Sequence, residues 1–277
     1  MQPERPTLTM PAELTRRAQA VVDGAADEWQ VPDAVDAATV ILLRDTPSGL
    51  EVFLQRRVNR MTFAPGMYVF PGGRVELSDA DLPWVGPQAE PFAVRAGAGV
   101  TATFRALTVA GARETWEEAG TALAATAAGA VTGTPQRPDD DFAAWLQQHG
   151  YRVDGTAFLP WSHWITPEVE ARRFDTRFLV TPLPPGQRAV DRGIESDHSS
   201  WFRPADALAR VRAGEMPMLP PTSHALEELA RFADVAAVVA EARQRRPRPW
   251  LPRPTRAATG DITWQLVDAY TGDVVVP

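Results

Sequence analysis

The chain has 277 residues, of which 44% are hydrophobic, and it carries a formal net charge of −7 with no cysteine. Its length suits one generous domain with appendages or two small domains, and an acidic chain is not expected to bind nucleic acid, which needs a basic surface. The absence of cysteine excludes disulfides, thiolate nucleophiles and iron–sulfur sites. Because all 28 basic residues are arginine, lysine-based phosphate loops and Schiff bases are excluded too.

The first 20 residues are polar and contain arginine, without the apolar segment of a secretory signal. No apolar run along the chain is long enough to span a bilayer. We therefore expect a cytoplasmic protein that binds neither a membrane nor nucleic acid.

The first third of the chain is predicted to contain one helix and several short strands. Apolar residues recur on one face over residues 12–29, which indicates a helix. Apolar and β-branched runs predict strands over 37–43, 51–55 and 67–70, and turn residues between the first two indicate a hairpin. Residues 77–99 are rich in proline, glycine and aspartate and are expected to contain little regular structure.

Two features beside these strands are candidates for ligand contact. The loop after the second strand contains Arg56, Arg57 and Arg60, which are either solvent-exposed residues or contacts for a phosphate. Gly72 and Gly73 follow the third strand, and adjacent glycines let the backbone turn sharply and expose its carbonyls to a ligand.

A further helix is predicted over residues 101–119, with Thr101 or Thr103 as its N-terminal cap and Gly120 at its C-terminal end. The residues spaced for its buried face are Phe104, Leu107 and Gly111, with Thr115 following. A connector of small residues follows over 122–138.

The C-terminal half is predicted to mix strands and helices. Helices are expected over 139–148, 204–212 and 223–244, and strands over 158–165, 177–181 and 201–202. Alternating arginine and proline over 246–254 indicate a linker, and two apolar runs around a Thr-Gly turn predict a hairpin over 264–276. This mixture predicts an α/β or α+β domain.

Three carboxylates cluster at the end of the helix predicted over 101–119. Glu114, Glu117 and Glu118 have the i, i+3 and i+4 spacing that places them on one side of a helix, where like charges repel. The cluster is therefore either a solvated surface or a site for a cation. Hard divalent cations prefer oxygen ligands such as these.

The sequence around these carboxylates resembles the Nudix box, G-x5-E-x7-R-E-U-x-E-E-x-G-U, where U is a bulky aliphatic residue. The matching residues are Phe70-Pro71-Gly72-Gly73 in the first half, and Arg113-Glu114, Glu117-Glu118 and Gly120 in the second. Arg113 follows Gly73 by 40 positions where the signature has 14, so 26 residues are inserted. Asp79 stands in the place of the first acid, and Thr115 and Thr121 replace aliphatic residues.

The interrupted box is similar to that of the Nudix subgroup typified by peroxisomal coenzyme A diphosphatases. Further segments similar to that subgroup are Arg56-Arg57 with Arg60, Phe63–Gly66, Trp164–Pro167, Arg173–Phe178 and Leu219–Thr222. The coenzyme A motif of other Nudix diphosphatases is matched only in part, because its second arginine falls on Thr62.

This resemblance implies an α/β fold, a Nudix-type α/β/α sandwich around a mixed sheet, with an N-terminal helix and a C-terminal hairpin appended. The Nudix domain is then expected over residues 33–245, with its insertion at about 77–100. Residues 1–32 would form a helical extension, and residues 246–277 a linker and hairpin.

The resemblance also implies metal-dependent hydrolysis of a diphosphate. The implied ligands of Mg²⁺ or Mn²⁺ are Glu114, Glu117, Glu118 and a carbonyl of Gly73 or its neighbour Gly72, with Arg113 orienting the glutamates. The implied catalytic residues are Arg113, Glu117, Glu195 and Asp197. Glu195 and Asp197 are the first candidates for the base, and Glu76 and Glu117 come after them. The implied substrate contacts are Arg56, Arg57, Arg60, Gly72 and Gly73.

Three functions stay open at this point. A coenzyme A or acyl-coenzyme A substrate is expected first, and ADP-ribose or a dinucleotide is the alternative with the same chemistry. The third is a non-catalytic nucleotide sensor that has kept the fold. The expected partner is a small-molecule diphosphate, and a homodimer is left open.

Overall fold

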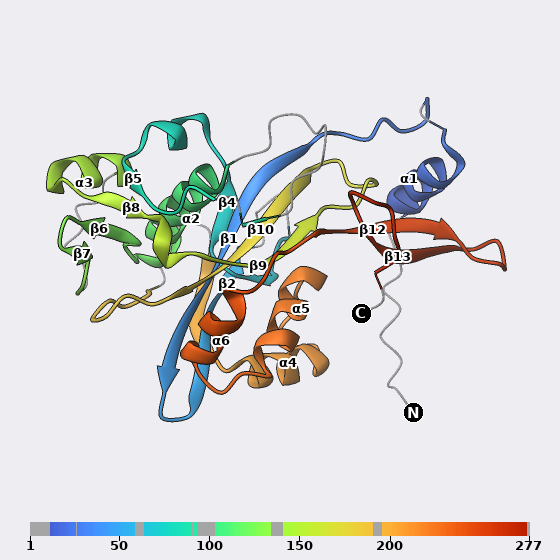
Figure 1. Ribbon diagram of the computed structural model, residues 1–277. Helices are drawn as coiled ribbons and strands as arrows, with labels where there is room; N and C mark the ends of the chain where they lie inside the picture. The colour runs from blue at the N-terminus through green and yellow to red at the C-terminus, as the bar shows by residue number, and fades with distance from the viewer. Residues whose placement is uncertain are drawn as a thin grey trace. The chain divides into compact units, whose positions relative to one another are not determined.

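The computed structural model of the chain describes residues 12–25, 27–58, 64–89, 91–92, 103–133, 141–190 and 196–275, without the side chains of residues 196 and 197 (Figure 1). Backbone contacts divide the chain into two compact units. The smaller unit comprises Met1–Val35, Ile165–Asp175 and Pro249–Pro277, and the larger comprises Asp36–Trp164 and Thr176–Arg248. The domain boundaries expected after residues 32 and 245 remain predictions.

The larger unit contains a sheet in which the strands follow the order β11-β2-β1-β10-β9. These strands are β1 (Ala34–Thr46), β2 (Gly49–Arg57), β9 (Leu159–Ile165), β10 (Arg173–Pro182) and β11 (Ser196–Phe202), with β3 (Tyr68–Val69) on β2 and β4 (Gly72–Arg74) on β1. β1 and β2 pair antiparallel around the turn from Thr46 to Gly49, which confirms the predicted hairpin.

The helices of this unit cover both faces of the sheet. They are α2 (Phe104–Ala119), α3 (Phe142–His149), α4 (Pro204–Arg212), α5 (Pro220–Leu229) and α6 (Val235–Ala242), with short 3₁₀ helices at Leu77–Asp81 and Gly155–Ala157. Phe53 of β2 packs into the core cluster of α2. The side chain of its neighbour Val52 points to the opposite face of the sheet. Val52 pairs with Phe202 of β11. The ring of Phe202 lies 5.5 Å from the guanidinium of Arg210 on α4. α2 and α4 thus lie on opposite faces, and the predicted α/β sandwich is confirmed.

α2 begins and ends where the sequence predicts. Thr103 is the N-terminal cap, since its hydroxyl accepts a hydrogen bond from the backbone N–H of Ala106 at 3.2 Å. Gly120 ends the helix with a φ of 66°, a left-handed conformation that glycine adopts without steric cost. The four residues expected on the inner face are all buried: Phe104, Leu107, Gly111 and Thr115.

A second, mixed sheet in the larger unit has the order β5-β8-β6-β7 and contains parallel and antiparallel pairs. Its strands are β5 (Trp84–Val85), β6 (Ala124–Thr126), β7 (Gly129–Ala130) and β8 (Arg152–Asp154). Two stretches expected to be irregular, 77–99 and 122–138, therefore contain short regular elements. Strands of two or three residues are too short to show a hydrophobic period in the sequence.

The single helix predicted over 223–244 is wrong, because two helices, α5 and α6, occupy this stretch. The side chain of Asp234 caps α6 by accepting a hydrogen bond from the N–H of Ala237 at 2.8 Å. Phe232, between the two helices, still packs against Trp161, with ring centroids 5.9 Å apart. Apolar periodicity therefore continues through the break, and Asp234 was the only local signal of a new helix start.

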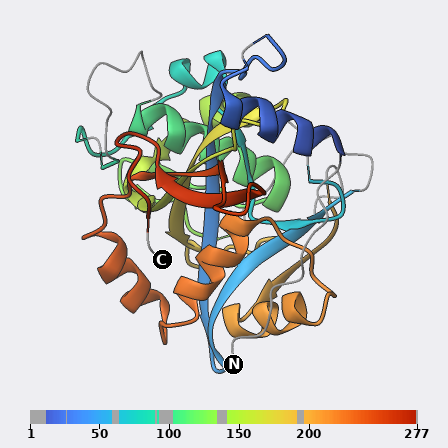
Figure 2. The ribbon, with the colours of Figure 1, turned by 90° about the vertical axis from the view of Figure 1, so that its right-hand side faces the viewer.

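The smaller unit contains α1 (Ala12–Asp23), β12 (Pro249–Arg256) and β13 (Ile262–Asp268), with α1 beside the paired strands (Figure 2). α1 ends short of the predicted residue 29. A C-terminal hairpin is present, but β12 occupies the predicted linker and pairs with β13. Pro252 and Pro254 are two positions apart, so their missing N–H groups fall on the same edge of β12 and the other edge keeps its donors.

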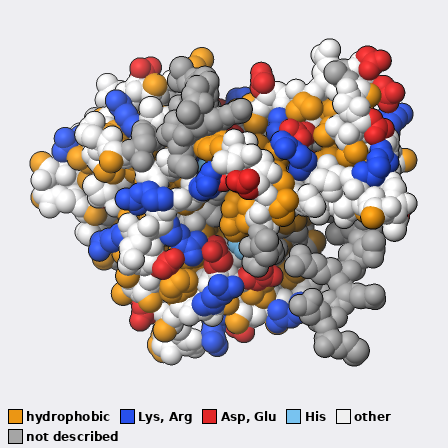
Figure 3. All heavy atoms as spheres, turned by 45° about the vertical axis from the view of Figure 1, so that its right-hand side comes forward, with side chains coloured by type: hydrophobic (Ala, Val, Ile, Leu, Met, Phe, Trp, Pro, Cys, Tyr) orange, Lys and Arg blue, Asp and Glu red, His pale blue; other side chains and the backbone are white. Residues whose placement is uncertain are grey.

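Among the described residues, no helix is long and apolar enough to cross a membrane. Figure 3 shows arginine and acidic side chains interspersed over one face of the molecule. Within the described side chains, this face therefore has no large area of a single charge.

Candidate active site

Gly72 and Gly73 lie in strand β4, where a sharp turn was predicted, and pair with Thr39 and Ala38 of β1. A Cβ atom on Gly72 would lie 2.4 Å from the carbonyl oxygen of Ala38, and one on Gly73 would lie 2.3 Å from Oε1 of Glu114. Both distances are well below van der Waals contact. The backbone of β1 therefore requires glycine at position 72, whereas at position 73 a larger residue would displace the carboxylate of Glu114.

Alanine at these two positions is expected to cause two different defects. Gly72→Ala drives a methyl group into the backbone of β1, which should destabilise the fold by about 1–3 kcal/mol or more. Gly73→Ala meets only the end of the Glu114 side chain, which can rotate away, so stability should change by less than about 1 kcal/mol. Displacing that carboxylate should lower the diphosphate hydrolysis expected from the sequence by about 100-fold. Urea unfolding and steady-state kinetics measure both effects, and equal destabilisation of the two variants would contradict this account.

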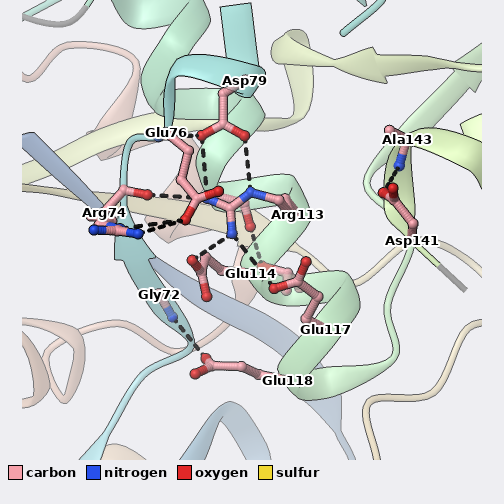
Figure 4. Close-up of polar contacts among 12 residues, drawn as sticks. Gly72, Arg74, Glu76, Asp79, Arg113, Glu114, Glu117, Glu118, Asp141 and Ala143 are labelled. Carbon is pink, nitrogen blue, oxygen red and sulfur yellow. Dashed lines mark hydrogen bonds and ion pairs between the residues drawn. The ribbon is translucent and has the colours of Figure 1, made fainter.

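The three glutamates of α2 lie on one side of the helix near β4 (Figure 4). The side chain of Glu117 is 46% exposed, that of Glu114 is 15% exposed, and Glu118 is 9% exposed as a residue. A solvated surface would leave all three carboxylates in water. The burial of Glu114 and Glu118 therefore favours a ligand site over a solvated helix face.

The carboxylate of Glu118 is held from two strands. Its Oε2 accepts hydrogen bonds from the backbone N–H of Gly72 at 2.9 Å and from Nε2 of Gln55 on β2 at 2.7 Å. Burial, together with the negative charge of Glu114, outweighs these hydrogen bonds and raises the pKa of Glu118 to about 8. An ionised Glu118 is therefore costly here without a compensating cation.

The stability of the metal-free protein is expected to fall as the pH rises from about 5 to about 8. In this range the folded state keeps the proton on Glu118, whereas the unfolded state, with a pKa of 4.5, has lost it. Rising pH therefore favours unfolding, by at most about 1.4 kcal/mol per pH unit from this group. Urea unfolding in the presence of a chelator should show this slope in the wild type and lose it in Glu118→Gln. Parallel pH profiles for the two proteins would contradict the assignment.

Arg113 is held between Asp79 and Glu114 (Figure 4). Its Nε and Nη2 donate to the two oxygens of Asp79 at 2.9 and 3.2 Å, and its Nη1 donates to Oε1 of Glu114 at 2.7 Å. Burial disfavours the charged guanidinium, but the hydrogen bonds and charges of Asp79 and Glu114 outweigh it and hold the pKa of Arg113 above its ordinary value. Asp79 is 0% exposed and also accepts a hydrogen bond from the backbone N–H of Glu76 at 2.8 Å. Asp79 thus anchors Arg113, which in turn orients Glu114.

Glu117 lies at the exposed edge of the cluster, with its Oε2 3.5 Å from Nη1 of Arg113. Its pKa is raised by burial, against the opposing charge of Arg113, and the carboxylates of Glu76 and Asp79 add to the rise. A carboxylate with a raised pKa is better suited to accept a proton near neutral pH. This environment is consistent with Glu117 as a candidate base.

Arg56 and Arg57 lie on opposite faces of β2, because consecutive side chains of a strand point in opposite directions. The charge of Arg57 acts on Glu118, whose pKa it lowers. Arg56 is instead paired with Tyr68 of β3 and with His198 of β11. The predicted group of substrate arginines is therefore divided, and Arg57 is the member on the side of the glutamates.

Three predicted residues cannot be placed in this site. Arg60 and Glu195 lie outside the described residues, and so does the side chain of Asp197. The backbone of Asp197 is at an irregularity of β11, where the register against β2 shifts between Ser196 and His198. The roles of Arg60, Glu195 and Asp197 stay predictions.

The described residues contain no group of three or more histidine and acidic side chains already gathered around a metal position. The chemistry of the donors nevertheless suits Mg²⁺ or Mn²⁺, because Glu114 and Glu118 place carboxylate oxygens beside the backbone of Gly72 and Gly73. The repulsion between these two carboxylates is what a cation would relieve. The residues present therefore fit a hard divalent cation.

Sequence reasoning missed Gln55 and left Asp79 without a role. Gln55 is a buried polar residue in the apolar strand before Arg56. The sequence signal for its role was a polar residue at a position that faces the core. The sequence signal for Asp79 was its position at the first acid of the Nudix signature.

Comparison with known proteins gives relatives over most of the chain. The acyl-coenzyme A diphosphatase NUDT19 of Gallus gallus is 28% identical over 87% of this chain and 79% of the relative. NUDT19 of Homo sapiens is 25% identical over 80% and 70% respectively. Among solved structures, a NUDIX hydrolase from Alicyclobacillus acidocaldarius is 29% identical with a TM-score of 0.63, covering 75% of this chain and 96% of its own. No family model matches the chain.

Proposed function

Because this chain belongs to the Nudix hydrolase superfamily, we propose that it hydrolyses the diphosphate linkage of coenzyme A or an acyl-coenzyme A, with Mg²⁺ or Mn²⁺ as cofactor. The observation that carries the chemistry is the buried pair Glu114 and Glu118, set against the backbone of Gly72 and Gly73 and oriented by Arg113. Support for the substrate comes from the chicken and human relatives, which are acyl-coenzyme A diphosphatases.

Each group of the site then has a defined task. The residues that would hold the cation are Glu114, Glu117, Glu118 and the carbonyl of Gly73. A divalent cation bound there neutralises charge on the diphosphate and lowers the pKa of an attacking water. Arg57 offers a guanidinium to the diphosphate from the same side of β2. Glu195 and Asp197 are the proton acceptors in this scheme, and Glu117 is the alternative acceptor if the other ligands hold the cation without it.

A panel of diphosphates assayed with Mg²⁺ and with Mn²⁺ tests this proposal. The panel contains coenzyme A, acyl-coenzyme A species of several chain lengths, ADP-ribose and dinucleoside polyphosphates. We expect release of a phosphopantetheine product, with the highest kcat/KM for a coenzyme A substrate. Faster turnover of ADP-ribose or a dinucleotide would keep the chemistry and reject the substrate.

The alternative function, a non-catalytic sensor, predicts a different result. Such a protein would bind a nucleotide without turnover at any metal concentration. The retained Glu114 and Glu118 argue against this function, because burying two repelling carboxylates is costly unless they bind a cation. Tight ligand binding by the wild type without product formation would favour the sensor.

A further inference from the structure

Gln55 connects β2 to the end of α2 through a buried hydrogen bond. Its side chain shares a face of β2 with Phe53 and Arg57, two positions away on either side. The residue is 2% exposed, and its Nε2 donates to Oε2 of Glu118 at 2.7 Å. This bond joins residues 63 positions apart, so the tertiary fold alone creates it.

Both donors to Glu118 use the same oxygen. The N–H of Gly72 and Nε2 of Gln55 both point to Oε2, and within the described part of the chain no other donor reaches this carboxylate. Two donors from different strands fix the plane of the carboxylate as one donor would not. They also leave Oε1 as the oxygen available to an external ligand.

A glutamine at position 55 lowers the stability of the folded state relative to an apolar residue of similar size. Its Oε1 is buried and has no hydrogen-bond partner among the described residues, and an unsatisfied buried carbonyl costs about 1–3 kcal/mol. Rotating the amide would not suit a metal ligand, because Oε1 would then face the ionised carboxylate that binds a cation. A residue such as methionine would fill a similar volume without this cost. The donor half of the amide is therefore what the residue contributes.

We propose that Gln55 is a positioning residue that holds the carboxylate of Glu118 by its Oε2 and leaves Oε1 for the cation that the site would bind. It would thereby set the metal affinity of the site. This inference rests on the cation site of the proposed function and not on its substrate or reaction, because it requires only that Glu118 is a metal ligand. Gln55 acts through Glu118 and need not touch the substrate or the metal.

Calorimetric titration of Mn²⁺ into Gln55→Met, without substrate, tests the inference. We expect affinity to fall by about 10- to 100-fold, as for other residues that orient a metal ligand. In the diphosphatase assay the metal concentration for half-maximal activity should rise by a similar factor, while kcat at saturating metal stays within about threefold of the wild type. A residue that only supports the fold would not separate these two parameters.

The matched control is Gln187→Met, at another buried glutamine. The amide of Gln187 bonds to backbone groups of Ala122 and Val131 instead of a carboxylate. This variant should lose stability, because three hydrogen bonds are removed, but keep the Mn²⁺ affinity of the wild type. Thermal unfolding of each variant establishes that the titrated protein is folded.

The possible outcomes separate this inference from the proposed function. Unchanged Mn²⁺ affinity in folded Gln55→Met would overturn the inference. If Gln55→Met does not fold, Gln55→Asn takes its place, because its shorter amide is withdrawn from Glu118. Wild-type Mn²⁺ affinity in Gln55→Asn would then overturn the inference. Weakened Mn²⁺ binding in a protein that cleaves no diphosphate would reject the proposed function and keep the inference. A wild type that binds no Mn²⁺ would overturn both.

Discussion

Glu118→Gln is expected to lower kcat/KM for the diphosphate substrate by about 1,000-fold while leaving the fold intact. The substitution keeps the size of the side chain and an oxygen that can accept the hydrogen bond from Gly72. It removes the negative charge, and a neutral amide is a weaker ligand for Mg²⁺ than a carboxylate. A loss of about 4 kcal/mol in transition-state stabilisation corresponds to this factor and is within what a catalytic cation contributes.

The matched control for this experiment is Glu241→Gln on α6. Glu241 is an exposed glutamate that pairs with Arg245, and the same charge is removed outside the site. Its kcat/KM should stay within about twofold of the wild type. Unfolding measurements should show Glu118→Gln to be at least as stable as the wild type at about pH 8, because a costly buried carboxylate has been removed. Activity of Glu118→Gln within tenfold of the wild type would exclude Glu118 as an essential ligand.

The shape of α2 and the side on which its glutamates lie could be predicted because several local signals agree. A threonine cap, an apolar period and a terminal glycine mark the same helix. The i, i+3 and i+4 spacing then decides which carboxylates share a side, whatever the rest of the chain does. Helix geometry alone fixes this relation.

The contacts of those glutamates could not be predicted in the same way. Asp79 reaches Arg113 across 34 positions, because the start of the insertion folds back as a 3₁₀ helix. Gln55 reaches Glu118 across 63 positions. Such contacts depend on how strands and helices pack, and no local pattern encodes them.

The two arginines of β2 illustrate how an element boundary changes a functional prediction. The strand was expected to end at residue 55, which left Arg56 and Arg57 in a loop where both could contact one phosphate. The observed strand continues through Arg57, so alternation places the two side chains on opposite faces. An error of two residues in the boundary was enough to join residues that the fold separates.

Arg113→Met is expected to lower the free energy of unfolding by about 3–5 kcal/mol, the usual cost of breaking a buried ion pair by removing one partner. Asp79 is 0% exposed and would lose the guanidinium that now bonds to both of its oxygens, which leaves a buried carboxyl without a partner. Arg74→Met is the matched control, since it removes the same charge from a side chain that is 67% exposed. Its stability should change by less than about 0.5 kcal/mol.

Stability and activity should separate in the double variant Asp79→Asn/Arg113→Met. Asparagine removes the unpaired buried charge but keeps an oxygen for the N–H of Glu76, so most of the lost stability should return. Activity should stay at least about 100-fold below the wild type, because Glu114 still lacks the hydrogen bond that orients it. Recovery of both properties together would mean that Arg113 serves only the fold. Recovery of stability alone would show that Asp79 and Arg113 form a structural ion pair, and that Arg113 also positions Glu114 for its role as a metal ligand.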